Sequence, residues 1–221
     1  MELVAAEMQP FNAIFENFHV HRETEKQAII LASKAQSQAK SYKFDEAERL
    51  FKEALGIDPR SSFVLMNYGI FKSDRGQIGD AIDLIERATQ YINKNTGFGI
   101  YYSLSQVYDK ILDRRQVERC LRKALEYQPN HRFAKHRLGV VVSRLGKYDE
   151  AIRIFDDLIQ KELSRESGPT DTLLYTYRSK IITLQKAGKS QMASKVFDEA
   201  RDELERWPRL AIRAYEIGKL L

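Results

Sequence analysis

Two short stretches of this sequence resemble each other and decide how the rest of the chain is organised. They are Tyr42–Ala47, which reads YKFDEA, and Gly146–Ile152, which reads GKYDEAI. In both, a run with helical apolar periodicity ends at a turn, and a second amphipathic run starts at the aromatic residue. The pattern predicts two helices joined by a tight turn at each place.

The residues that punctuate these helices recur at a fixed spacing. Gly76 and Gly146 lie 70 residues apart, and so do Pro59 and Pro129. A spacing of 70 is two units of 34 plus two residues, which suggests an internal repeat with a period of 34. Five windows carry the pattern: 28–61, 62–95, 98–131, 132–165 and 174–207.

Residue size follows position within these windows. The eighth and twentieth positions hold small residues, as Gly139 and Ala151 do, except at Ile181 and Val117, and the twenty-fourth holds a large residue such as Phe155. A glycine just past the first helix, as at Gly146, allows the left-handed backbone that ends a helix at low cost. Each window therefore predicts a pair of antiparallel helices, with Asp149 as an N-cap of the second helix in the fourth window. The predicted helices span 26–40, 44–56, 61–74, 78–93, 97–111, 113–127, 131–145, 148–162, 171–187 and 190–206.

These windows resemble tetratricopeptide (TPR) repeats, and the two stretches quoted above are typical of that family. The resemblance covers residues 28–207, interrupted at 96–97 and 166–173. It implies an all-α fold, a right-handed superhelical solenoid of antiparallel helix pairs with about five repeats and a C-terminal capping helix. Because one helix pair cannot bury its own apolar face, neighbouring pairs must stack.

The two ends fall outside the repeats. Residues 1–27 form an N-terminal amphipathic segment in which Phe11, Ile14, Phe15 and Phe18 share one helical stripe. We expect this stripe to cap the first repeat or to dock elsewhere. Residues 208–221 read as a capping helix or as the first helix of a truncated sixth repeat, in which case the chain is a fragment of a longer protein.

Composition excludes several functional classes. The chain has 221 residues, of which 43% are hydrophobic and 30% charged, with a net charge of +5 and one cysteine. A single cysteine excludes an internal disulfide framework. No signal peptide and no apolar run of the ~20 residues that cross a bilayer is present, so we expect a cytoplasmic protein without membrane contact. Phosphate loops, paired cysteines and catalytic motifs are missing, and we expect no enzymatic activity, cofactor or metal.

The resemblance also implies where a partner binds. In TPR proteins the first helix of each repeat lines a concave groove, and here the same positions run from apolar and aromatic residues to basic ones. Val140, Ser143, Ser179, Ile182 and Lys186 hold some of these positions in the last two windows. The candidate peptide-binding residues are Phe63, Met66, Asn67, Ile70, Tyr102, Gln106, Phe133, His136, Arg137, Arg144, Tyr175 and Arg178.

The expected function is that of a protein-interaction scaffold, alone or as a module of a longer protein. Its partner would be a protein or peptide segment with apolar anchors and acidic residues, held in the groove. Two alternatives stay open. The stretch from residue 113 to residue 137 contains eight basic and three acidic residues, a composition that favours RNA binding. The apolar ends could instead make the chain self-associate into a homo-oligomer.

Overall fold

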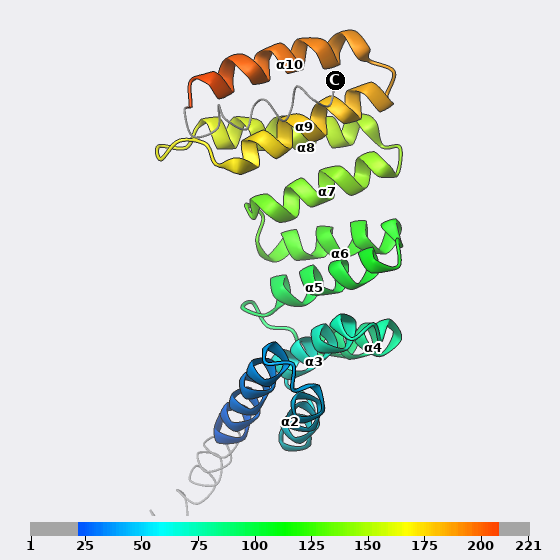
Figure 1. The fold of residues 1–221 in the computed structure, drawn as a ribbon, viewed down its shortest axis with the longest axis vertical. Helices are drawn as coiled ribbons and strands as arrows, with labels where there is room; N and C mark the ends of the chain where they lie inside the picture. Colours follow the sequence, from blue (N-terminus) through cyan, green and yellow to red (C-terminus); the bar gives the residue numbers. More distant parts are fainter. Residues whose placement is uncertain (1–21, 208–221) are drawn as a thin grey trace, which may run out of the picture. The chain divides into compact units, whose positions relative to one another are not determined.

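The structure is a computed structural model that describes residues 22–207, and the described part consists of helices joined by short turns (Figure 1). Residues 22–40 are helical. The helices that follow are α2 (Phe44–Ile57), α3 (Ser62–Asp74), α4 (Ile78–Ala88), η1 (Thr89–Tyr91), α5 (Gly97–Lys110), α6 (Arg114–Tyr127), α7 (Arg132–Arg144), α8 (Tyr148–Leu163), α9 (Asp171–Lys186) and α10 (Ser190–Glu205). The all-α class and the succession of helix pairs are therefore confirmed, with helix ends mostly within one or two residues of the predicted ones. The largest difference is in α4, which ends at Ala88 and continues as the short 3₁₀ helix η1.

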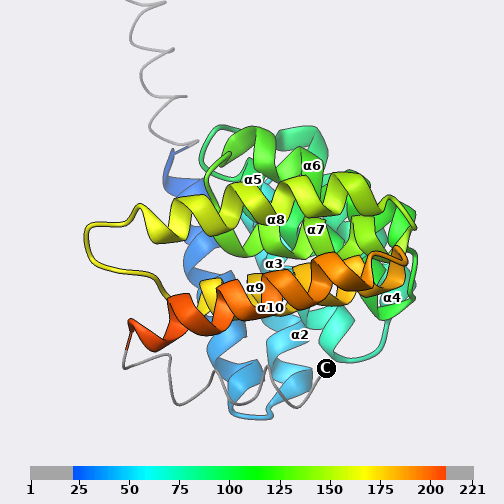
Figure 2. The same cartoon turned by 90° about the horizontal axis from the view of Figure 1, so that it is seen from above.

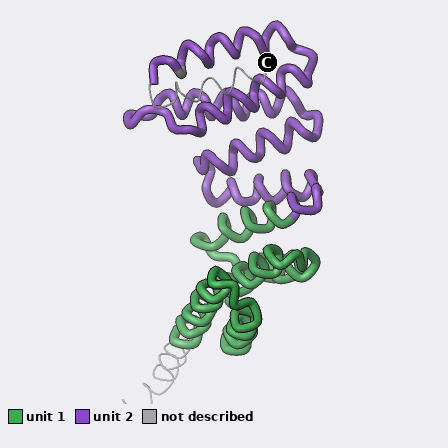
Figure 3. The backbone as a smooth tube through the Cα atoms, viewed as in Figure 1, with its two compact units in different colours: residues 1–107 green, residues 108–221 purple. Residues whose placement is uncertain are grey.

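The chain divides into two compact units, residues 1–107 and 108–221, with the boundary inside α5 (Figure 3). In unit 1, α3 packs against α2 and α4. In unit 2, α7 packs against α6, α8 and α9, and α9 also packs against α8 and α10, as the view in Figure 2 shows for the last helices. The helices of a pair are thus joined to the next pair by direct packing, which gives each unit a continuous apolar core.

Small residues at the predicted close-packing positions let two helices cross at short distance. A Cβ placed on Gly139 would lie 2.5 Å from Cε1 of Phe155, a side chain of α8 that is fully buried. Gly69 in unit 1 is equally confined, by the Ile85 side chain and by the carbonyl oxygen of Ala81 at 3.0 Å. No larger residue fits at either place without displacing its neighbours.

The turns inside the helix pairs use left-handed backbone, as predicted for the glycines. Gly76, Gly146 and Gly188 have φ values of +77°, +80° and +73°. Tyr42 and Leu112 occupy the corresponding positions of the other two windows, with φ values of 61° and 60°. Both side chains are exposed, so the backbone geometry of the turn is kept even where a side chain makes it unfavourable.

The predicted N-cap was wrong. The residue that precedes α8 is Lys147, and its side chain makes no capping hydrogen bond. Asp149 lies in the first turn of α8, where its carboxylate accepts a hydrogen bond from Lys189 at 2.7 Å. A carboxylate in the first turn still interacts favourably with the helix dipole.

Candidate functional site

In unit 2, helices α7 and α9 enclose a hollow of about 370 Å³, called here the α7/α9 hollow. Both are the first helices of their windows, and their exposed faces are the ones that the repeat pattern assigns to a groove. The lining residues are His136, Val140, Ser143, Arg144, Tyr175, Arg178, Ser179, Ile182, Thr183 and Lys186. Four of the candidate residues are thus brought together, and of the lining residues only Thr183 does not occupy a predicted groove position.

Polar bonds hold the two walls of the α7/α9 hollow together. Ser143 Oγ of α7 lies 2.8 Å from Thr183 Oγ1 of α9, and the Thr183 hydroxyl donates to the Ser179 carbonyl at 2.7 Å. The Ser143 hydroxyl is therefore the donor in the bond between the helices. These side chains are buried or half-buried, so the spacing of α7 and α9 is set before any ligand arrives.

His136 forms part of the floor of the hollow. Its Nε2 atom lies 3.2 Å from the carbonyl oxygen of Tyr175 and 3.0 Å from Ser179 Oγ. Burial lowers the pKa of His136, and the bond to the Tyr175 backbone raises it only in part. Because a carbonyl oxygen only accepts, we assign the proton of the neutral ring to Nε2, which leaves Nδ1 as an acceptor.

The charge of the α7/α9 hollow is positive. Arg144, Arg178 and Lys186 line it, and among the residues that the structure describes no aspartate or glutamate does. In the described part of the chain no carboxylate pairs with any of these three side chains, and Arg144 and Arg178 are exposed. Beside them, Tyr175 keeps 45% of its surface exposed. The hollow therefore offers guanidinium groups and an aromatic face to an anionic ligand.

Unit 1 holds a second hollow of about 330 Å³, called here the α2/α3 hollow, which is mainly apolar. Residues of helix 22–40, α2 and α3 line it: Gln36, Ala39, Lys40, Phe44, Phe51, Asn67, Ile70, Phe71, Asp74 and Arg75. Gln36 donates to Asn67 across it at 2.6 Å, and the Arg75 guanidinium stacks over the Phe44 ring at 4.1 Å. The three phenylalanines were not predicted as site residues, because two of them lie on the second helix of the repeat.

Four other candidate residues of unit 1 line neither the α2/α3 hollow nor the α7/α9 hollow. Met66 lies against α5, with its sulfur 3.5 Å from the Cβ position of Gly99. Tyr102 stacks on Phe98 with 5.4 Å between ring centroids, and Phe63 is half-buried. Gln106 is exposed on α5.

Two candidate residues of unit 2 lie outside the α7/α9 hollow. Arg137 donates a hydrogen bond to Asp109 Oδ2 at 3.4 Å and keeps only 24% of its side chain exposed, so it is already paired within the protein. Phe133 is exposed at the start of α7, between two other hollows. Neither residue lines the α7/α9 hollow.

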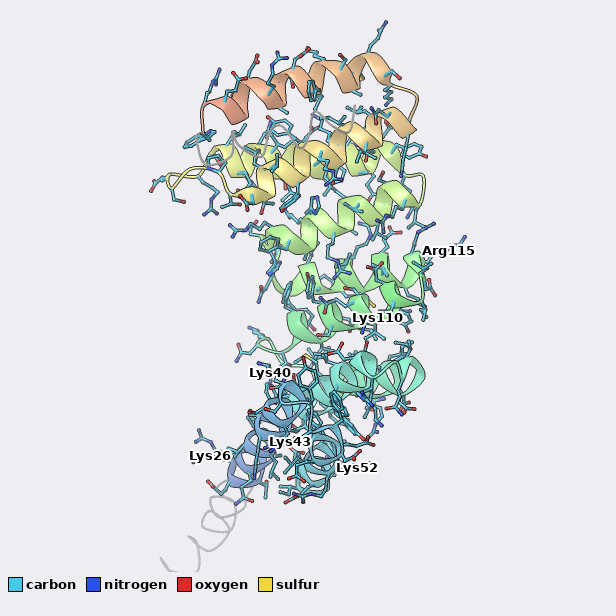
Figure 4. All side chains as sticks on the ribbon, in the orientation of Figure 1. Lys26, Lys40, Lys43, Lys52, Lys110 and Arg115 are labelled. Atoms are coloured by element: carbon cyan, nitrogen blue, oxygen red, sulfur yellow. The ribbon has the colours of Figure 1, made fainter. Side chains whose placement is uncertain are left out.

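Ion pairs also reduce the free charge of the basic stretch 113–137. Arg122 bonds to Glu118 and Glu150, and Lys135 bonds to Asp157 at 2.8 Å. Among the other cations, Arg115 is exposed, and Figure 4 shows its side chain extending away from α6. The stretch 113–137 thus presents separate free cations and not the continuous stripe of basic side chains that its composition suggested.

The remaining expectations concern metals, membranes and the chain ends. Within residues 22–207 no three His, Cys, Asp or Glu side chains are grouped so that they could hold a metal ion. Among the same residues, no helix has the length and hydropathy that a membrane span requires. The Phe11–Phe18 stripe and the tail 208–221 lie outside the described residues.

Sequence comparison identifies the repeat. A family model described as "Tetratricopeptide repeat" matches residues 98–131, which is the third predicted window, and one described as "PPR repeat" matches residues 141–163. The chain carries tetratricopeptide repeats. "Tetratricopeptide repeat protein 8" of Caenorhabditis elegans is 27% identical to it over 109 residues, which are 49% of this chain and 22% of that protein. The chain thus spans about a fifth of the length of this curated relative.

Solved TPR structures have the same fold. The MamA protein superimposes with a TM-score of 0.68 at 22% identity, over 82% of this chain and 93% of MamA. YrrB, described as "a TPR protein with an unusual peptide-binding site", gives a TM-score of 0.64 at 18% identity, over 90% of this chain and 97% of YrrB. At these identities the likeness concerns the fold of the repeats.

Proposed function

We propose that this TPR protein is a protein-interaction scaffold that binds a peptide segment containing acidic residues in the α7/α9 hollow. The observation that carries the proposal is the lining of that hollow, to which residues 22–207 contribute three cations and no carboxylate. Two guanidinium groups on facing helices can each bind a carboxylate through two parallel hydrogen bonds. Tyr175 adds an exposed ring against which an apolar side chain of the segment can pack.

The α2/α3 hollow of unit 1 is a second, separate candidate site, which would accept an apolar side chain of a partner. Three phenylalanines line it, and its charged lining residues are Lys40, Asp74 and Arg75. An apolar side chain buried there would gain roughly 1.5–3 kcal/mol. YrrB, which shares the fold, is described as having a peptide-binding site. The partial coverage of the curated relative fits a role as a module of a longer protein.

The proposal can be tested with peptides selected on the intact chain. We expect a random 12-residue display library panned on the full protein to enrich sequences with two or more Asp or Glu residues beside an apolar one. Arg144→Ala and Arg178→Ala should each weaken a selected peptide about tenfold, since each removes a charge-assisted contact. Fluorescence anisotropy of the labelled peptide measures the change.

The matched control is Arg153→Ala, which removes an exposed cation from α8, outside the hollow. It should leave the affinity within about twofold of the original protein. Enrichment of peptides without acidic residues, or equal losses for all three variants, would contradict the proposal.

A further inference from the structure

Phe133 stands as a ridge between two hollows at the edge of unit 2, away from the α7/α9 hollow. The first hollow, of about 540 Å³, lies between the start of α7 and the end of α8; the second, of about 400 Å³, lies against the loop before α9. Phe133 and Arg132 line both. The Phe133 ring is 51% exposed, and the Arg132 guanidinium lies 5.1 Å from its centroid.

The first hollow has an excess of positive charge. Arg132, Lys135, Lys161 and Arg165 line it, against one carboxylate, Glu162. Glu162 is buried and accepts hydrogen bonds from the Thr170 amide at 2.8 Å and from the Thr170 hydroxyl at 2.7 Å, so it closes the loop and does not face the hollow as a free charge.

In the described part of the chain, two of these four cations already pair with a carboxylate, and the other two, Arg132 and Arg165, do not. Lys135 and Lys161 share the carboxylate of Asp157, at 2.8 Å and 3.0 Å. Arg165 donates only to loop oxygens, those of Gly168 and Ser167 at 3.3 Å, and neither it nor Arg132 has a carboxylate partner in the described part of the chain. The second hollow differs, because Asp171 lines it and disfavours a phosphate there.

We propose that this ridge binds single-stranded RNA, with a base stacked on Phe133 and the adjoining phosphates held by Arg132 and Arg165 in the first hollow. An aromatic face open to solvent beside cations on one side is the arrangement that single-strand binders use, since every base has a π face and every linkage a negative charge. An acidic peptide would bind the same cations, so the test includes polyglutamate as a competitor. The second hollow, with its hydroxyl groups and Asp171, accommodates the polar edge of the base.

The test measures anisotropy of a fluorescein-labelled 12-nucleotide oligouridine with the full chain, across a range of salt concentrations. Phe133→Ala should lower the association constant about tenfold without changing the salt dependence, because stacking releases no counterions. Phe133→Trp should restore it. Arg165→Ala should reduce the slope of log K against log salt by about 0.7, the value for one phosphate contact on a single strand.

Arg119→Ala is the matched control, since it removes an exposed cation from α6 at the same change in net charge. It should leave both the affinity and the slope unchanged. The proposal is overturned if no RNA binds at low salt, if polyglutamate of equal charge displaces the RNA as well as unlabelled oligouridine does, or if Arg119→Ala acts like Arg165→Ala. The peptide proposal is unaffected by these outcomes, because its arginines line another hollow.

Discussion

Phe155→Ala should lower the free energy of unfolding of unit 2 by about 4 kcal/mol, because it removes a fully buried aromatic side chain and leaves a cavity. The ring lies against Gly139, so the two positions should be strongly coupled. Gly139→Ala alone should destabilise unit 2 by about 1 kcal/mol, since overpacking outweighs the gain in helix propensity. In the Phe155→Ala background the same change should become stabilising, by up to about 1 kcal/mol, because the ring is gone.

Urea unfolding of the full chain followed by circular dichroism measures these energies, and hydrogen exchange of α7 and α8 assigns them to unit 2. Gly146→Ala is the control, because nothing lies within 4 Å of its Cβ position and its cost comes from the φ value of +80°. That cost, about 1 kcal/mol, should be the same in both backgrounds. A Gly139→Ala effect that is equally independent of Phe155 would contradict the close crossing of α7 and α8.

Glu48→Gln should destabilise unit 1 by about 2–3 kcal/mol at neutral pH, because it leaves the buried ammonium of Lys72 without its main partner. The Glu48 carboxylate lies 2.9 Å from Lys72 Nζ, whose side chain is only 9% exposed, and it also accepts from Lys52 and Tyr68. The bond to Lys72, followed by the bond to Lys52, lowers the pKa of Glu48 from 4.5 to about 2.

The lowered pKa of Glu48 determines how the stability of unit 1 depends on pH. A carboxyl group whose pKa is lower in the folded state stabilises the fold fully above 4.5, and that stabilisation is lost as the pH falls from about 4.5 to about 2. The difference between the original protein and Glu48→Gln should therefore shrink over this range. Adding Lys72→Met to Glu48→Gln should recover part of the loss, because it removes a buried ammonium whose remaining partners are Gln77 at 3.1 Å and the Asp80 carboxylate at 3.8 Å.

Glu53→Gln is the matched control, since Glu53 lies on the same helix and, among residues 22–207, pairs only with the exposed Arg49, at 3.1 Å. Its cost should stay below about 0.5 kcal/mol. Urea unfolding at several pH values gives the free energies of unfolding of the original protein and of the three variants. Equal costs for the two glutamates, or a Glu48→Gln effect that does not vary below pH 4.5, would show that Lys72 does not depend on this carboxylate.

Much of the fold could be predicted from the sequence because the repeat constrains it locally. The small residue at Gly139 packs against the large one at Phe155, and both this contact and the turn at Gly146 lie within one helix pair. Because such pairs recur with a period of 34 residues, these features can be recognised in the sequence. The N-cap at Asp149 was misplaced by two residues, since the acidic residue belongs to the first turn and pairs with Lys189 of the next helix pair.

The candidate site was harder to predict because it depends on contacts between helix pairs. Arg137 occupies a groove position, but its pairing with Asp109 of another helix cannot be read from spacing. Phe133 also occupies such a position, yet it lies at the start of α7, where residues of α8 and of the loop before α9 line the adjoining hollows. His136 and Arg178 lie in the middle of their helices and line the same hollow, because there the repeat alone sets which residues lie next to each other.

The most direct test of the account is a charge reversal at the α7/α9 hollow. The affinity of the double variant Arg144→Glu/Arg178→Glu would be measured for a selected acidic peptide and for the same peptide with its acidic residues replaced by lysine. We predict that the variant binds the acidic peptide at least about 100-fold more weakly than the original protein does, and that it prefers the lysine peptide. Undiminished binding of the acidic peptide by the variant would show that this hollow is not where the partner binds.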